Sequence, residues 1–97
     1  MKMDKMIRYM DRMPRLNCTL KSLAVLAGYS RIHFQRLFME YTGMTFREYM
    51  LRKRVERYRR AVKKDNVSLK EIADELGFAS ESVLCHWKDR VQKKYRL

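Results

Sequence analysis

Glycine and proline are scarce in this 97-residue chain, which contains three glycines and one proline. Signals for tight turns are therefore few, and no stretch alternates apolar and polar residues in the manner of a β-strand. Apolar residues instead recur at the spacing of one helical face, for example at Met3, Met6, Ile7, Met10 and Met13. The sequence therefore predicts an all-α fold.

Long apolar runs are also lacking. The longest aliphatic run, 23–27, has five residues, whereas a membrane span needs about 20. Charged residues interrupt the methionines at the N-terminus, so no apolar core of a signal peptide is present. Cys18 and Cys85 lie far apart in the sequence and form no CxxC motif, which predicts free thiols in a reducing compartment. These features predict a cytoplasmic protein that does not associate with membranes.

No arrangement of residues predicts an enzyme. The sequence offers no nucleophile with a matching base, no glycine-rich phosphate loop and no carboxylate pair that could be argued to share a cleft. Residue types that bind zinc occur at Cys18, Cys85, His33 and His86, but their spacing matches no zinc-ligand pattern. We therefore expect no catalytic activity, no metal and no cofactor.

Acidic residues are outnumbered about two to one. The chain has 23 Lys and Arg against 11 Asp and Glu, for a formal net charge of +12. Such a charge attracts polyanions, and nucleic acid is the usual partner of this kind. A hydrophobic content of 46% is too high for a disordered basic tail. The excess is uneven, because net charge is +5 in residues 1–44, +6 in 45–65 and +1 in 66–97.

An internal repeat organises the chain. Residues 19–30 read TLKSLAVLAGYS, and residues 68–79 read SLKEIADELGFA. Each copy begins with a hydroxyl residue that can cap a helix and ends the helix at a glycine, Gly28 or Gly77. A serine follows, Ser30 or Ser80, that can cap the next helix. Helix, short glycine turn and helix form the helix-turn-helix pattern, in which the second helix enters the major groove of DNA.

A long helix is predicted between the two copies, over residues 45–64. Apolar residues cover about half of its circumference, and basic residues cover the opposite arc. A helix of this length spans about 30 Å, close to the roughly 34 Å between successive major-groove openings on one face of B-DNA. We therefore expect it to hold two reading units about one DNA turn apart. Arg54 lies within the apolar arc and needs a partner, so we expect it to anchor this helix to a neighbouring unit through Asp74 or Glu75.

These motifs resemble the DNA-binding region of the AraC/XylS family of bacterial transcription regulators, particularly its stand-alone members of the MarA and SoxS type. The resemblance extends from about Leu20 to Leu97 and rests on AxxAGYS at 24–30, FQRLF at 34–38, TGMTF at 42–46 and IAxxLGF at 72–78. It implies about seven helices, in two helix-turn-helix units joined by a long connecting helix. It also implies promoter activation through contacts with RNA polymerase. The expected parts are residues 1–44 (an N-terminal helix plus the first unit), 45–64 (the connecting helix) and 65–97 (the second unit).

In the first unit, the helix that follows Ser30 is expected to read bases. Its inner face is expected to comprise Phe34, Leu37, Phe38 and Tyr41, and its outer face carries Ile32, Gln35 and Arg36. Arginine pairs with guanine and glutamine with adenine through two hydrogen bonds each, and isoleucine can contact a thymine methyl group. The resemblance places base readers at the same three positions. Ser30 and Arg31 are expected to contact the DNA backbone.

The second unit has weaker signals for base reading. Leu84, Trp87 and Val91 are expected to face inward, and the resemblance places base contacts near Ser82, Val83 and His86. Acidic residues at Glu81 and Asp89 would repel phosphates, and within the second unit, residues 65–97, no arginine occurs before Arg90. We predict that the first unit supplies most of the specificity. The second unit would position the protein on the backbone through Ser80, Ser82 and Lys88.

The sequence thus predicts a nucleoid-associated regulator of transcription that binds double-stranded DNA as a monomer, because one chain carries two reading units. Two alternatives remain open. One is a partner-binding anti-regulator, a decoy that keeps the fold but binds DNA weakly. The other is a basic amphipathic helix that acts at membranes or acidic partners.

Overall fold

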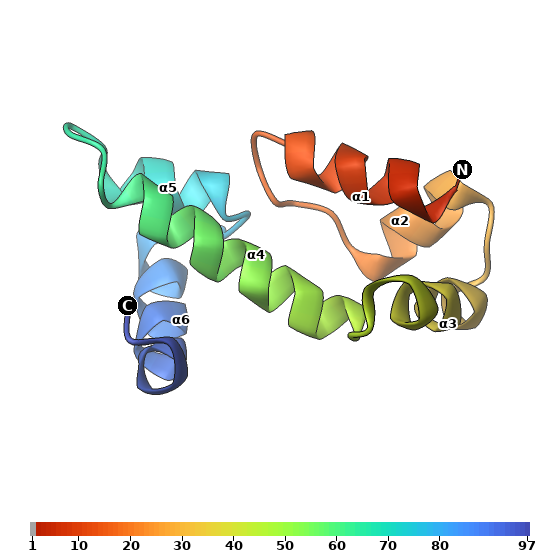
Figure 1. Ribbon diagram of the computed structural model, residues 1–97. Helices are drawn as coiled ribbons and strands as arrows, with labels where there is room; N and C mark the ends of the chain where they lie inside the picture. The colour runs from red at the N-terminus through yellow and green to blue at the C-terminus, as the bar shows by residue number, and fades with distance from the viewer. Residues whose placement is uncertain (1) are drawn as a thin grey trace. The chain divides into compact units, whose positions relative to one another are not determined.

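The structure is a computed structural model that describes residues 2–97. Those residues contain α-helices and no β-strand, which confirms the all-α prediction (Figure 1). The helices are α1 (Met3–Arg12), α2 (Leu20–Ala27), α3 (Arg31–Thr42), α4 (Phe46–Ala61), α5 (Leu69–Glu75) and α6 (Glu81–Tyr95). The described part of the chain thus has six helices where the resemblance implied about seven. Residues 81–95 form one uninterrupted helix, because no glycine or proline breaks it. None of the six is long and apolar enough to span a bilayer.

Both copies of the repeat form the same capped turn. Thr19 and Ser68 cap α2 and α5, each accepting a hydrogen bond from a backbone N–H three residues later. Gly28 and Gly77 adopt left-handed φ angles of 79° and 81°, which other residues adopt only with strain. In each copy the residue after the glycine donates a 2.9 Å hydrogen bond to the carbonyl five residues earlier, from Tyr29 to Ala24 and from Phe78 to Ala73. This is the pattern of a Schellman C-cap.

The first compact unit comprises the residues up to Pro14 and Cys18–Leu51. Its core includes the methionine stripe of α1, with Met6 and Met10 fully buried. An aromatic cluster surrounds Phe38, whose ring lies edge-to-face with Phe46 at 5.5 Å and with Tyr49 at 5.2 Å. Tyr41 was expected in this core but is 57% exposed. Phe34 and Phe38 are fully buried on the inner side of α3, whereas Tyr41, on the same side, precedes the last residue of the helix, where that side is no longer covered.

The second compact unit comprises Arg15–Asn17 and Arg52–Leu97. Trp87 lies at its centre, with its ring 5.5 Å from that of Phe78 and 6.1 Å from that of Tyr58. The short segment at 15–17 crosses the end of α5, where the Leu16 N–H donates a 2.9 Å hydrogen bond to the Glu75 carbonyl. Leu16 is fully buried. The turn of the second helix-turn-helix therefore packs against a segment that precedes the first one in the sequence.

The connecting helix α4 is shorter than the predicted 45–64. It ends at Ala61, after which the N–H groups of Lys63 and Lys64 bond to carbonyls three residues earlier, a tighter spacing than that of an α-helix. Asn66 then takes a left-handed φ of 60°. Residues 62–64, which were predicted to extend the helix, therefore belong to the turn that leads toward α5.

Two arginines of α4 have little contact with solvent: Arg54 is half-buried and Arg57 is buried. The Arg54 Nε–H donates a 3.0 Å hydrogen bond to the Leu76 carbonyl, and its guanidinium lies 5.2 Å from the centre of the Phe78 ring. Arg54 thus contacts the end of α5 and the following turn. Arg57 is only 5% exposed. Its burial was not predicted from the sequence, because it depends on packing around α4.

Replacing Arg54 with methionine is expected to lower the free energy of unfolding by about 1–2 kcal/mol, since a hydrogen bond to a carbonyl and a cation–π contact are both lost. Urea unfolding followed by Trp87 fluorescence measures this change. The control is Arg60→Met, because Arg60 is exposed on the same helix and pairs with Glu56 at the surface, a contact worth little. Equal destabilisation by both substitutions would contradict an anchoring role for Arg54.

Candidate nucleic-acid interface

The helix α3 begins at a firmly capped N-terminus. The Ser30 Oγ accepts a 3.1 Å hydrogen bond from the His33 N–H, and Arg31 is exposed in the first turn. A serine that accepts such a bond keeps its own O–H as a donor, which suits a DNA phosphate. Ser30 and Arg31 therefore carry groups that can contact a DNA backbone.

The packing of α3 determines which of its side chains face solvent. Phe34 and Phe38 are fully buried, which fixes the rotation of the helix about its axis. Ile32 is 80% exposed, and Gln35 and Arg36 are also exposed. The three predicted base readers of the first unit thus lie on the solvent side of one rigidly packed helix.

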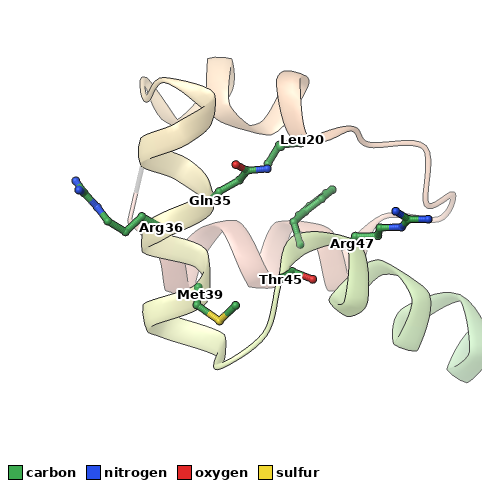
Figure 2. Close-up of a pocket in the computed structure, with 7 residues that line it drawn as sticks. Leu20, Gln35, Arg36, Met39, Thr45 and Arg47 are labelled. Carbon is green, nitrogen blue, oxygen red and sulfur yellow. The ribbon is translucent and has the colours of Figure 1, made fainter.

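Gln35 and Arg36 extend in different directions from this helix (Figure 2). Arg36 extends away from the rest of the unit, whereas Gln35 points toward the side on which Leu20 and Arg47 lie. Successive residues of an α-helix are separated by about 100°, since 3.6 residues complete one turn. The two side chains can therefore contact different base pairs, or one base pair and the adjacent backbone.

The helix α6 is the counterpart of α3 in the second unit. The Ser80 Oγ accepts a 3.3 Å hydrogen bond from the Val83 N–H, and Leu84 and Trp87 are buried. The predicted contact residues Ser82, Val83 and His86 are exposed, whereas Lys88 is half-buried.

Counting from the caps Ser30 and Ser80 shows how the two helices differ. Position by position, α6 has Ser82 in place of Ile32, Cys85 in place of Gln35 and His86 in place of Arg36. Lys88 takes the place of the buried Phe38, which accounts for its reduced exposure. The second helix therefore presents no arginine at the position where α3 presents Arg36.

A cavity of about 530 Å³ lies beside α3. Its lining residues are Leu20 from α2; Gln35, Arg36 and Met39 from α3; and Thr45, Phe46 and Arg47 at the start of α4 (Figure 2). Arg47 and this cavity were not predicted from the sequence. A signal for Arg47 was present, because Gly43 ends α3 and the Thr45 Oγ1 accepts a hydrogen bond from the Glu48 N–H. A glycine followed by a capping threonine places Arg47 in the first turn of the next helix.

Comparison with known proteins identifies the family. The family model described as a helix-turn-helix domain matches residues 23–91. The chain belongs to the AraC-type helix-turn-helix family. This AraC-type domain is 31% identical over 78 residues to the HTH-type transcriptional activator Btr of Bacillus subtilis, a match that covers 80% of the chain and 15% of Btr. It is 29% identical over 76 residues to the probable transcription factor PqrA of Proteus vulgaris, covering 78% of the chain and 59% of PqrA. The AraC-type domain therefore spans less than two thirds of either relative.

Two solved structures share the fold of this AraC-type domain. One is the C-terminal domain of the two-component response regulator yesN from Fusobacterium nucleatum, with a TM-score of 0.80 and 20% identity, covering 97% of this chain and 95% of that one. The other is the DNA-binding domain of AdpA, solved in complex with a target DNA, with a TM-score of 0.74 and 23% identity, covering 91% of this chain and 80% of that one. These similarities confirm the fold.

Proposed function

We propose that the protein is a transcription regulator that binds double-stranded DNA in a sequence-specific manner and acts as an activator. The exposed side of α3 supports this most directly. Ile32, Gln35 and Arg36 project from a helix that is capped at its start and held by two fully buried phenylalanines. Rigid presentation of side chains that can bind base edges, in a chain of net charge +12, suits reading in the major groove.

The two units are proposed to contribute unequally to DNA binding. The first unit, within residues 1–44, supplies most of the base readout. The second unit, within 65–97, contacts mainly the backbone through Ser80, Ser82 and Lys88, with weaker base contacts by Val83 and His86. The connecting region, 45–64, joins them on a bipartite site that one monomer occupies. The lower net charge of 66–97, which is +1, supports this division.

The proposed setting is the bacterial cytoplasm, at the nucleoid, with contacts to RNA polymerase at promoters. We propose that the protein has no enzymatic activity and needs no cofactor. The names of Btr, an activator, and PqrA, a probable transcription factor, support the regulatory function.

A decoy is the second candidate function, and the surface of α2 favours it. Val25 and Leu26 are 72% and 47% exposed, an apolar pair that a protein partner could cover. The second copy of the repeat has the acidic residues Asp74 and Glu75 at the equivalent positions. Tight association with a protein, combined with weak DNA binding, would favour this function.

Selection of binding sites from random duplexes of about 30 base pairs, at near-physiological salt, tests the proposed function. We expect enrichment of one strong box, bound by the first unit, with a weaker second box about one turn away. Two equally strong boxes would show that the second unit also reads bases, contrary to the proposed division. Binding without any enriched sequence, which weakens steadily as salt rises, would indicate counterion release alone and would favour the decoy.

A further inference from the structure

The cavity beside α3 has the dimensions and lining of a ligand site. Its volume of about 530 Å³ falls within the roughly 300–1,000 Å³ typical of pockets for small molecules. We propose that it binds a small organic anion with an apolar body, such as an aromatic carboxylate or sulfonate, and that the bound anion prevents α3 from reading DNA. The second half of this proposal rests on the proposed function, whereas the first half does not.

Apolar side chains make up much of the wall. Leu20, Met39 and Phe46 line the cavity, and Met39 is 43% exposed. Phe46 is held in place by edge-to-face contacts, with its ring 5.5 Å from that of Phe38 and 6.3 Å from that of Phe34. Because Phe46 is held by the aromatic core of the unit, this part of the wall is in place without a ligand. An apolar body would gain free energy by covering these side chains.

The polar part of the lining favours a negative charge. The lining includes two arginines, Arg36 and Arg47, and the amide residue Gln35, and none of the described lining residues is acidic. The side chains of Arg36 and Arg47 both extend outward, Arg36 from α3 and Arg47 from the opposite side of the cavity, at the start of α4 (Figure 2). A carboxylate or sulfonate can accept two parallel hydrogen bonds from one guanidinium. Arg47 is the proposed partner of the anionic group, because its exposed side chain can rotate toward the cavity from the side opposite α3. Gln35 points toward the cavity and can donate a further hydrogen bond (Figure 2).

Two residues that line the cavity are also proposed to read bases, so a bound ligand would interfere with DNA binding. Gln35 and Arg36 line the cavity and are also the proposed readers of adenine and guanine. An occupant that holds Gln35 would remove a donor and an acceptor from DNA recognition. A ligand that binds only the DNA-free form weakens DNA binding by a factor that grows with its concentration over its Kd. The loss is about tenfold at ten times that Kd.

The test begins with the protein alone and the fluorescent anion anilinonaphthalene sulfonate, titrated by fluorescence anisotropy. We expect saturable binding of one anion, weakened about five- to tenfold by Arg47→Gln. The control is Arg60→Gln, which removes the same charge from an exposed residue of the second unit and should change the affinity less than about twofold. The neutral analogue phenylnaphthylamine should bind more weakly than the anion. Equal losses in the two variants, or equal binding of the neutral analogue, would overturn the proposed site.

A second pair of variants tests the cavity itself. Met39→Trp should fill it and abolish binding of the anion, and Met39 is exposed enough for the larger side chain to leave folding intact, which circular dichroism checks. Tyr41→Trp places the same ring at another exposed position of α3, outside the lining, and should bind the anion as the wild type does. Loss of binding in both variants, or in neither, would contradict this location.

Competition with DNA tests the regulatory half. With the anion at ten times its measured Kd, the affinity for the selected duplex should fall about tenfold in the wild type. In Arg60→Gln the anion should weaken DNA binding by the same factor. An anion that binds as expected but leaves the DNA affinity unchanged would overturn the inhibition and leave the proposed function intact. Absence of specific DNA binding before any anion is added would instead refute the proposed function, and the titration of the protein alone would remain valid.

Discussion

Replacing Gly77 with alanine is expected to lower the free energy of unfolding by about 2–5 kcal/mol. Two costs combine at this position. A residue with a Cβ in the left-handed conformation loses about 1–2 kcal/mol, and Gly77 has a φ of 81°. The new Cβ would also overlap the carbonyl oxygen of Leu16. That oxygen belongs to the backbone of the fully buried Leu16, so it cannot move aside as a flexible side chain would, and overpacking of this kind costs about 1–3 kcal/mol.

Gly28→Ala is the matched control for this substitution. Gly28 holds the same place in the first copy of the repeat and has nearly the same φ, 79°, but within residues 2–97 no atom beyond its immediate surroundings in the chain lies within 4 Å of the Cβ that alanine would add. Only the conformational cost of about 1–2 kcal/mol therefore applies. The difference between the two variants isolates the contact with Leu16.

Urea unfolding followed by far-ultraviolet circular dichroism, and by Trp87 fluorescence for the second unit, measures both changes. A domain of this size has a total stability of about 5–15 kcal/mol, so Gly77→Ala should remove a large fraction of it. If Gly28→Ala and Gly77→Ala destabilised the protein equally, the packing of residues 15–17 against the second turn would be wrong.

Local signals explain why much of the fold could be predicted from the sequence. The caps at Thr19, Ser30, Ser68 and Ser80 depend on residues within one turn of the helix that they begin, and each forms the expected hydrogen bond. Both glycine turns likewise depend on the neighbouring residues alone. The repeat then made the helix-turn-helix architecture recognisable, because two weak local patterns in the same order are far more specific than one.

Contacts between residues distant in the sequence account for what was not predicted. The packing of Leu16 against Gly77 joins residues 61 positions apart, and no periodicity in the sequence predicts it. The burial of Arg57 and the cavity beside α3 likewise arise from packing of several elements. Tyr41 occupies a position that helical spacing assigns to the core, yet it is exposed. Periodicity predicts which residues share a face, but packing determines how far along the helix that face is covered.

Replacing Arg36 with alanine is expected to weaken binding to the selected DNA site by about 1–3 kcal/mol, or about 5- to 150-fold. Arg36 is exposed on α3 and extends away from the unit (Figure 2), and an arginine in the major groove can donate two hydrogen bonds to a guanine. Removal of one base reader should also relax the preference at one position of the site. Fluorescence anisotropy with the selected duplex measures the affinity, and a repeated site selection measures the preference.

The salt dependence of binding separates this base contact from a phosphate contact. Loss of a phosphate contact weakens binding to every sequence. It also reduces the magnitude of the negative slope of log K against log salt by about 1. Loss of a base contact spares non-specific binding and leaves that slope nearly unchanged. We expect the second pattern for Arg36→Ala.

His86→Ala is the matched variant in the second unit, because His86 holds the place in α6 that Arg36 holds in α3. Neutral imidazole offers one N–H donor where guanidinium offers five, so it cannot form the paired donation to guanine. We therefore expect His86→Ala to cost less than about 1 kcal/mol and to leave the preferred sequence of the strong box unchanged. If Arg36→Ala left the site preference untouched while His86→Ala abolished it, the two units would have the opposite roles, and specificity would reside in α6.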